Sequence, residues 1–179
     1  TELIDQKAIG DIRLVQLQMH QPHHTDLIPN SDTNWRTDPA ISGGGLFHDL
    51  SPHQLDLMIY FFGVPQKSSG LSLNQAGLYR ADDMVSGQIL FRNSVLFNGS
   101  WCFNAAEKTD SCEIIGNKGK ITFPMFGHKI TLRRNGLDED FIFDPLPHVQ
   151  QPMIEQVVNY FLGKGENPCS AEDALLCMQ

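Results

Sequence analysis

The sequence predicts an α+β domain in which a largely antiparallel, open-faced sheet of about six to eight strands carries helices on one face. Three observations lead to this fold class. Strand-length runs of β-favouring residues fill the chain between residues 69 and 143, short Asn- and Gly-containing links join several of them, and helical patterns lie toward the ends. With 179 residues, of which 41% are hydrophobic, the chain is long enough to bury one core as a single domain.

The strands are predicted from composition and periodicity. Residues 12–20 alternate apolar and polar side chains, which is typical of a strand with one covered face. The links at 92–94 and 117–119 suit tight hairpins, so neighbouring strands are expected to pair antiparallel. The acidic run 138–140 is interpreted as a solvated hairpin turn. The remaining strands are expected at 69–75, 84–91, 95–103, 111–115, 120–123, 129–134 and 140–143.

One helix is predicted to begin at Pro52. Ser51 is suited to be its N-cap, Pro52 to occupy the first helical position, and Gln54 to complete a capping box. The helix then runs to about Phe62, and Asp49 lies in the turn before it.

A second helix is predicted at 152–162, where the apolar positions form one stripe that is expected to pack on the sheet. The other face of the sheet is then open. If Ser100, Trp101 and Phe103 leave this open face apolar, its simplest partner is a second copy of the chain.

The composition excludes several classes of partner. A net charge of −8 and a pI near 5.2 argue against nucleic acid and anionic membranes, and favour a neutral or polar small substrate. The four cysteines have no CxxC spacing, which indicates reduced thiols in the cytoplasm. The sequence contains no G-x-G-x-x-G motif, P-loop, signal peptide or apolar run of membrane length.

Asp49 and His53 form the leading candidate site. On a helix, side chains four residues apart lie on one face, where a carboxylate can orient a histidine that moves protons. The alternative is structural, with His53 at a helix start and Asp49 capping exposed amides. Together with Asp56 these residues could ligate a metal, but their spacing matches no zinc motif, so no metal site is predicted.

The segment 21–41 is too long for a passive connection, which makes it a candidate wall or lid of a substrate pocket. Trp35 is suited to stack on a polar ligand and Arg36 to hydrogen-bond it. Alternatively, Trp35 anchors the segment on the core and Arg36 forms a surface ion pair. His148, just before the last long helix, is a further candidate for substrate binding.

Three motifs occur in an order shared with a known family. They are Trp35-Arg36-x-Asp38-Pro39, Ser42-Gly43-Gly44-Gly45 and Asp49-x-x-x-His53-x-x-Asp56. In this order they resemble the C-terminal domain of the glucose-fructose oxidoreductase, inositol dehydrogenase and rhizopine-catabolism (Gfo/Idh/MocA) family. The resemblance implies a C-terminal domain of the glyceraldehyde-3-phosphate dehydrogenase type. Residues 1–179 would then be a substrate-binding and oligomerisation domain that lacks its N-terminal dinucleotide-binding (Rossmann) half.

The resemblance also implies an activity. The full-length protein would be an NAD(P)-dependent oxidoreductase acting on a hydroxyl or ketone of a sugar, cyclitol or related small molecule. His53 would be the general base and Asp49 would orient it. NAD or NADP would be bound mainly by the missing half, which also supplies a lysine absent here, so the fragment alone is expected to be inactive. Cofactor contacts are assigned to Gly43, Gly44 and Gly45, and substrate contacts to Trp35, Arg36, Asp56 and His148.

Two alternatives remain open within this family. One is an NAD-dependent glycoside hydrolase on the same scaffold, and the other is a non-catalytic regulator that binds nucleotide. The expected partners are a sugar-like small molecule, the Rossmann domain and further copies of the chain through the open sheet face, but neither nucleic acid nor membrane.

Overall fold

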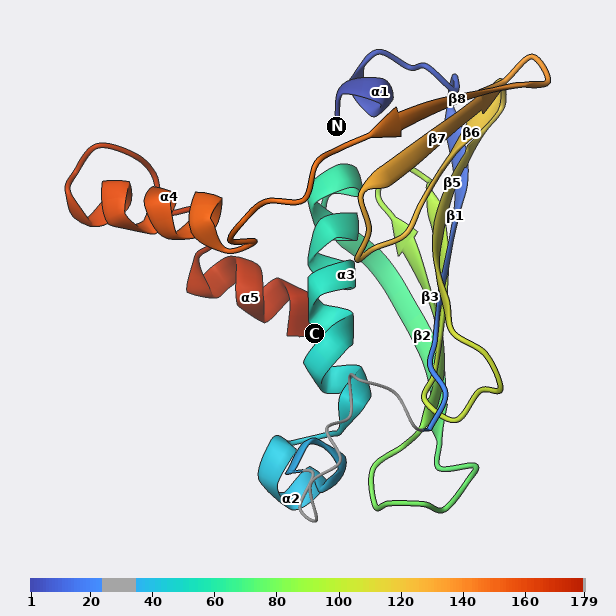
Figure 1. Cartoon of the computed structure of the whole chain (residues 1–179), viewed down its shortest axis with the longest axis vertical. Coiled ribbons are helices and arrows are strands. Elements are labelled where there is room, and N and C mark those ends of the chain that lie inside the picture. Colours follow the sequence, from blue (N-terminus) through green and yellow to red (C-terminus); the bar gives the residue numbers. More distant parts are fainter. Residues whose placement is uncertain (24–34, 179) are drawn as a thin grey trace.

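A computed structural model describes residues 1–23 and 35–178, which form an eight-stranded sheet with α3, α4 and α5 on one side (Figure 1). The strand order is β2-β3-β4-β1-β5-β6-β7-β8, and every pair is antiparallel except β1 with β4. The predicted α+β class with an open, largely antiparallel sheet is therefore confirmed. The strands are β1 (Ile12–His20), β2 (Pro65–Leu73), β3 (Met84–Phe91), β4 (Leu96–Cys102), β5 (Thr109–Gly116), β6 (Gly119–Phe123), β7 (Lys129–Arg134) and β8 (Leu137–Ile142).

The acidic run 138–140 is not a turn, so that prediction was wrong. It lies within β8, where Asp138 pairs with Arg133 and Asp140 with Lys129 across the β7–β8 ladder. The turn is instead made by Asn135 and Gly136, whose φ values of 54° and 77° suit a tight hairpin. Cross-strand charge pairing explains why acidic residues are tolerated in this edge strand.

The helical elements are α1 (Glu2–Asp5), the 3₁₀ helix η1 (Trp35–Thr37), α2 (Pro39–Ser42), α3 (Leu46–Phe62), α4 (Gln151–Phe161) and α5 (Ala171–Met178). The predicted start of α3 was wrong, because the helix begins at Leu46 and passes through Pro52 without ending. Leu46 is 1% exposed and the ring of Phe47 packs edge-on against Trp101, with centroids 5.0 Å apart. Burial of this first turn offsets the hydrogen bond that Pro52 cannot donate. Ser51 and Gln54 are buried in the helix rather than capping it.

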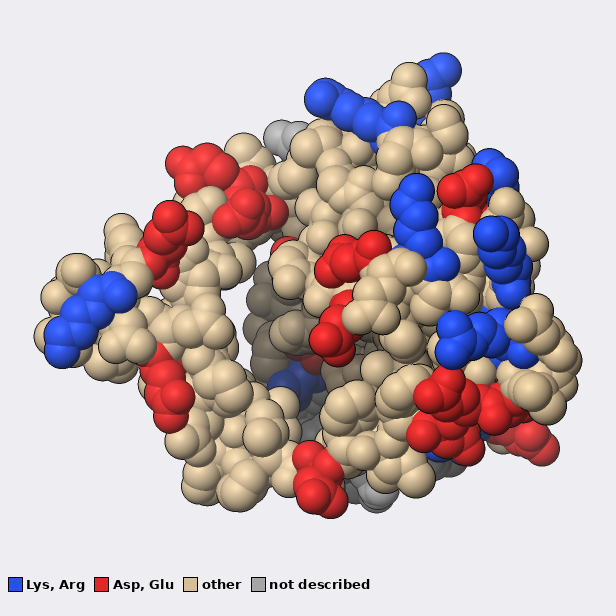
Figure 2. Space-filling view, turned by 90° about the horizontal axis from the view of Figure 1, so that it is seen from above, with Lys and Arg blue, Asp and Glu red and all other residues tan. Residues whose placement is uncertain are grey.

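The predicted packing of α4 on the sheet was also wrong. Figure 1 shows α4 projecting away from the sheet, and Figure 2 shows the same arm standing off from the body of the molecule. None of its residues is buried, although its apolar stripe is present as predicted. The central part of the covered sheet face is already occupied by α3, whose Phe62 packs on Phe91.

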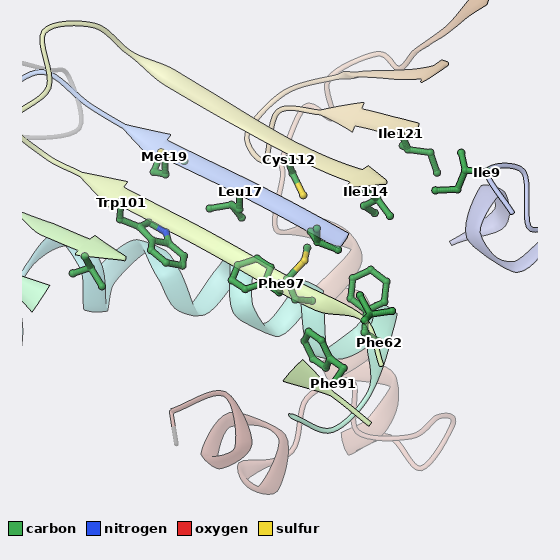
Figure 3. Packing of buried hydrophobic residues seen from close by; sticks show 14 of the residues in the cluster. Ile9, Leu17, Met19, Phe62, Phe91, Phe97, Trp101, Cys112, Ile114 and Ile121 are labelled. Carbon is green, nitrogen blue, oxygen red and sulfur yellow. The ribbon is translucent and has the colours of Figure 1, made fainter. Parts of the chain in front are cut away.

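Trp101 and Phe103 belong to the core and not to the open face. Figure 3 shows Trp101 with Phe97 between β4 and α3, and both Trp101 and Phe103 are at most 2% exposed. The alternate positions form the open face, which is largely polar across the middle of the sheet. One row runs across it through Ser86, Ser100, Gln18 and Ser111. The expectation of an apolar open face is therefore corrected, because the pleat directs Ser100 and Trp101 to opposite sides.

Candidate active site

The outer face of α3 is polar and exposed, whereas its inner face lies on the sheet. Helical spacing brings the exposed residues onto one stripe, at positions i, i+4, i+7 and i+11. They are Asp49, His53, Asp56 and Tyr60. The buried residues Met58 and Phe62 hold the opposite side of the helix on the core. The imidazole of His53 therefore faces outward and is accessible, as a proton-transferring histidine must be.

Asp49 is joined to the segment before α3 by an ion pair. Arg36 Nε lies 3.1 Å from Asp49 Oδ2, and the Arg36 guanidinium carbon lies 4.6 Å from the centre of the Trp35 ring. Arg36 thus forms a surface ion pair, one of the two alternatives left open by the sequence. Trp35 is 48% exposed, so it does not anchor the segment on the core. Most of the segment 21–41 predicted as a pocket wall lies outside the described residues.

Asp49 and His53 share the helix face, but no hydrogen bond joins them among the described residues. The partner that orients the Asp49 carboxylate is Arg36. In this structure the imidazole of His53 is therefore not held by a direct hydrogen bond to Asp49.

The three glycines each have a structural reason. Gly43 ends α2 with a φ of 83°, and Gly45 precedes α3 with a φ of 106°, close against Ala81. A Cβ on Gly44 would lie 2.1 Å from Nδ1 of His48, so the imidazole of His48 lies directly over this glycine. The amides of Gly44 and Gly45 point to Ser42 Oγ, at 3.4 and 3.1 Å. Their assignment to cofactor binding stays a prediction.

The remaining predicted residues are spread over the molecule. Asp56 lies on the outer stripe of α3, next to α5. Burial, with a smaller contribution from the charge of Asp56, raises the pKa of the Cys177 thiol, which donates to the Pro52 carbonyl at 3.4 Å. His148 is exposed on the linker between β8 and α4, where its backbone oxygen accepts from Gln151 N at 3.1 Å. No interaction in the described part of the chain ties its side chain to α3.

Two features of the site region were not found from the sequence. Gln54, fully buried in α3, accepts a hydrogen bond from Trp101 Nε1 at 2.5 Å, across 47 residues. His48 lines a cavity of about 490 Å³ on the flank of α3 together with Ser51 and Pro52, whereas Asp49 and His53 do not line it. Helical periodicity alone could have placed Ser51 and Gln54 on the inner face, had the helix been started at Leu46.

The described residues contain neither a metal-binding cluster nor a membrane-spanning helix. Within residues 1–23 and 35–178, no three His, Cys, Asp or Glu side chains come close enough together to hold a metal ion. In the same residues, every helix is too short or too polar to cross a lipid bilayer.

The fold is that of a C-terminal domain of the Gfo/Idh/MocA class. The Gfo/Idh/MocA C-terminal domain model matches residues 1–122, and the chain belongs to this family. Oxidoreductase P35 from Formosa agariphila is 45% identical over 175 residues, which cover 98% of this chain and 54% of the relative. The chain thus spans about half the length of the curated relative it matches.

Solved structures share the fold at low sequence identity. The aldose-aldose oxidoreductase of Caulobacter crescentus, complexed with glycerol, superposes with a TM-score of 0.80 at 19% identity, covering 99% of this chain and 53% of that one. The WlbA dehydrogenase of Bordetella pertussis, in complex with NADH and UDP-GlcNAcA, gives a TM-score of 0.74 at 18% identity, with coverages of 99% and 53%.

Proposed function

We propose that residues 1–179 are the C-terminal, substrate-binding domain of an NAD(P)-dependent oxidoreductase of the cytoplasm. Its substrate would be a sugar, cyclitol or related small molecule carrying the reacting hydroxyl or ketone. The observation that carries this proposal is the outward-facing His53, with Asp49 on the same helix face and the Trp35–Arg36 pair beside it. The names of the relatives support the reaction class, since they include an aldose oxidoreductase and a dehydrogenase complexed with NADH.

In this proposal His53 is the general base. Its exposed imidazole takes the proton of the substrate hydroxyl, and Asp49 lies on the same face of the helix one turn away. Arg36 keeps Asp49 in place through their ion pair. Bound nicotinamide would supply the hydride acceptor.

The substrate contacts follow from the same face. The exposed ring of Trp35 provides a stacking surface for a sugar. The carboxylate of Asp56 can accept a hydrogen bond from one of the hydroxyls of that sugar. His148 and the stretch Gly43–Gly45 keep their predicted roles in substrate and cofactor binding. The amides of Gly44 and Gly45 point to Ser42 Oγ. The phosphates of NAD or NADP would therefore be bound by an N-terminal dinucleotide-binding domain. Further copies of the chain would pack on the open, polar sheet face.

The experiment is carried out on the full-length protein. Turnover of sugars and cyclitols is followed by reduction of added NAD or NADP, for the parent protein and for His53→Ala. General-base catalysis contributes about 10²- to 10⁴-fold, so kcat should fall by at least about 100-fold. His128→Ala, on the β6–β7 loop, serves as the control and should keep full activity. Unchanged turnover of the His53 variant would falsify the assignment.

A further inference from the structure

A groove runs between α3 and the edge strand β2, on the flank of the helix. It consists of two adjoining cavities of about 490 and 300 Å³, which share Phe47, Leu55, Ser68 and Ile89. Volumes of this size are ordinary for small-molecule sites. The outer stripe that carries His53 lies on another face of the same helix, so this groove is separate from the proposed catalytic position.

Part of the floor of the groove is glycine backbone, at Gly70 and Gly87. Gly70, Gly87 and Gly99 are cross-strand neighbours on β2, β3 and β4. Above Gly99 the space is filled by the ring of Trp101, which would lie 2.3 Å from an added Cβ. Above Gly87 it is open, because an added Cβ would meet only Ser69 O, at 3.6 Å. The sheet is therefore hollowed at β2–β3, where a flat ring can rest on the backbone.

Ser51 supplies an unpaired polar group. Its residue is 2% exposed and lines the larger cavity, yet its hydroxyl has no hydrogen-bond partner among the described residues. A hydroxyl that lines a cavity and forms no hydrogen bond within the described chain is free to bond to a ligand or to water. Pro52, beside it, cannot donate to the carbonyl of His48, which leaves that oxygen without its usual helical donor.

The lining of the groove contains few charged residues. Lys67 is the one fully charged residue among those that line the two cavities, and it pairs with Leu90, which alternates with the covered Ile89 and Phe91. Its side chain therefore belongs to the open face of the sheet. What remains is an apolar wall that includes Phe47 and Leu55, together with uncharged polar groups. These polar groups include the hydroxyls of Ser51 and Ser68, the amide of Gln66 and the imidazole of His48.

We propose that this groove is a second binding site, for an uncharged hydroxylated ring such as a neutral sugar unit. The apolar face of the ring would lie against Phe47 and Leu55, and its hydroxyls would bond to Ser51 and Ser68. The site is independent of the chemistry proposed for His53.

The test uses the full-length protein with methyl β-D-glucoside as the probe and D-glucuronate as its charged analogue. Binding is measured by NMR chemical-shift titration of backbone amides, with dissociation constants expected on the order of millimolar. Gly87→Leu directs a side chain into the groove, and Gly87→Ala does so with an ordinary van der Waals contact. The matched control is Gln18→Leu, whose side chain lies on the open face at β1 and lines neither cavity.

The expected result is a shift of Gly87, Ser68 and Ser51 amides with the glucoside and a weaker response to glucuronate. Gly87→Leu should weaken binding at least tenfold and Gly87→Ala severalfold, whereas Gln18→Leu and His53→Ala should leave it within twofold. If Gly87→Leu does not fold, the affinity of the Gly87→Ala variant and the positions of the shifted amides test whether the glucoside binds in the groove. The proposal is overturned if the glucoside does not bind, if both Gly87 variants bind normally, or if His53→Ala abolishes binding. The dehydrogenase assay of the full-length protein is a separate measurement, so failure of one proposal does not imply failure of the other.

Discussion

Arg36 Nε donates to Asp49 Oδ2 at 3.1 Å, and this ion pair links η1 to the first turn of α3. Both side chains are about one-third exposed or more, so solvent screens the pair and its contribution to stability is small. The main effect of the ion pair is to fix the position of the Asp49 carboxylate. The carboxylate on the face of His53 is held by a residue 13 positions earlier in the chain.

Replacement of Arg36 by Ala should separate stability from activity. The free energy of unfolding in urea should change by less than about 1 kcal/mol, because the pair is partly exposed. In the full-length protein, kcat/KM should fall at least tenfold, because Asp49 loses the partner that orients it. Arg36→Lys keeps the charge but not the guanidinium geometry, and should recover only part of the activity. Equal activity of the parent and Arg36→Ala would contradict this positioning role.

Gln54 should be important for stability. Its replacement by Ala leaves the indole N–H of Trp101 unpaired in the core and opens a cavity, at a cost of about 2–4 kcal/mol. Urea unfolding followed by tryptophan fluorescence measures this loss. Gln18→Ala, on the open sheet face, is the control and should cost less than about 0.5 kcal/mol. A Gln54 variant as stable as the Gln18 variant would show that the buried hydrogen bond contributes little.

Gly43 and Gly45 should differ in their tolerance of a side chain. At Gly43 an added Cβ meets open space, so Gly43→Ala should cost only the strain of its positive φ, about 1–2 kcal/mol. At Gly45 the same change also drives Cβ to within 2.4 Å of the Ala81 side chain, so the cost should be clearly larger, about 3 kcal/mol or more. Thermal unfolding of the two variants checks the order, and a reversed order would refute the packing described around Ala81.

The start of α5 should depend on pH. Hydrogen bonds from the Ser170 amide and hydroxyl hold the pKa of Asp173 below its usual value. A carboxyl group with a lowered pKa in the folded state stabilises the fold above its unfolded pKa of about 3.9, and this stabilisation is lost as the pH falls through the folded value. Amide hydrogen exchange in α5 should therefore accelerate, beyond its intrinsic pH dependence, below about pH 4.

The same pH experiment has a control in two variants. Asp173→Asn should produce at neutral pH the fraying that the parent shows in acid. Glu172→Gln, in the same first turn, should leave exchange in α5 unchanged. If both variants behave alike, the effect comes from general charge and not from the Ser170–Asp173 cap.

Most of the sheet could be predicted because strand signals are local. Alternation and short links placed β1, β3 and β7 with their observed bounds. The errors fell where tertiary contacts override local preference. The start of α3 was hidden by Pro52, whose local effect is outweighed by burial of Leu46, and the acidic residues of β8 are held in a strand by basic partners on β7.

The shared helix face of the candidate residues could be predicted, but their contacts could not. Helical spacing correctly indicated that Asp49, His53 and Asp56 share one face. That Asp49 pairs with Arg36, and that Trp101 lies under α3 against Gln54, could not be found from spacing, because each contact joins distant parts of the chain.

By itself the sequence determined the class of fold, the amphipathic helices and the residues on the outer face of α3. These features depend on periodicity and side-chain chemistry, which involve only residues close together in the sequence. The tertiary structure alone decided which sheet face is covered, where α4 goes, which partner Asp49 takes and where the sheet is hollow above Gly87. These depend on how α3 packs on the sheet, and competition for that buried surface involves the whole chain at once.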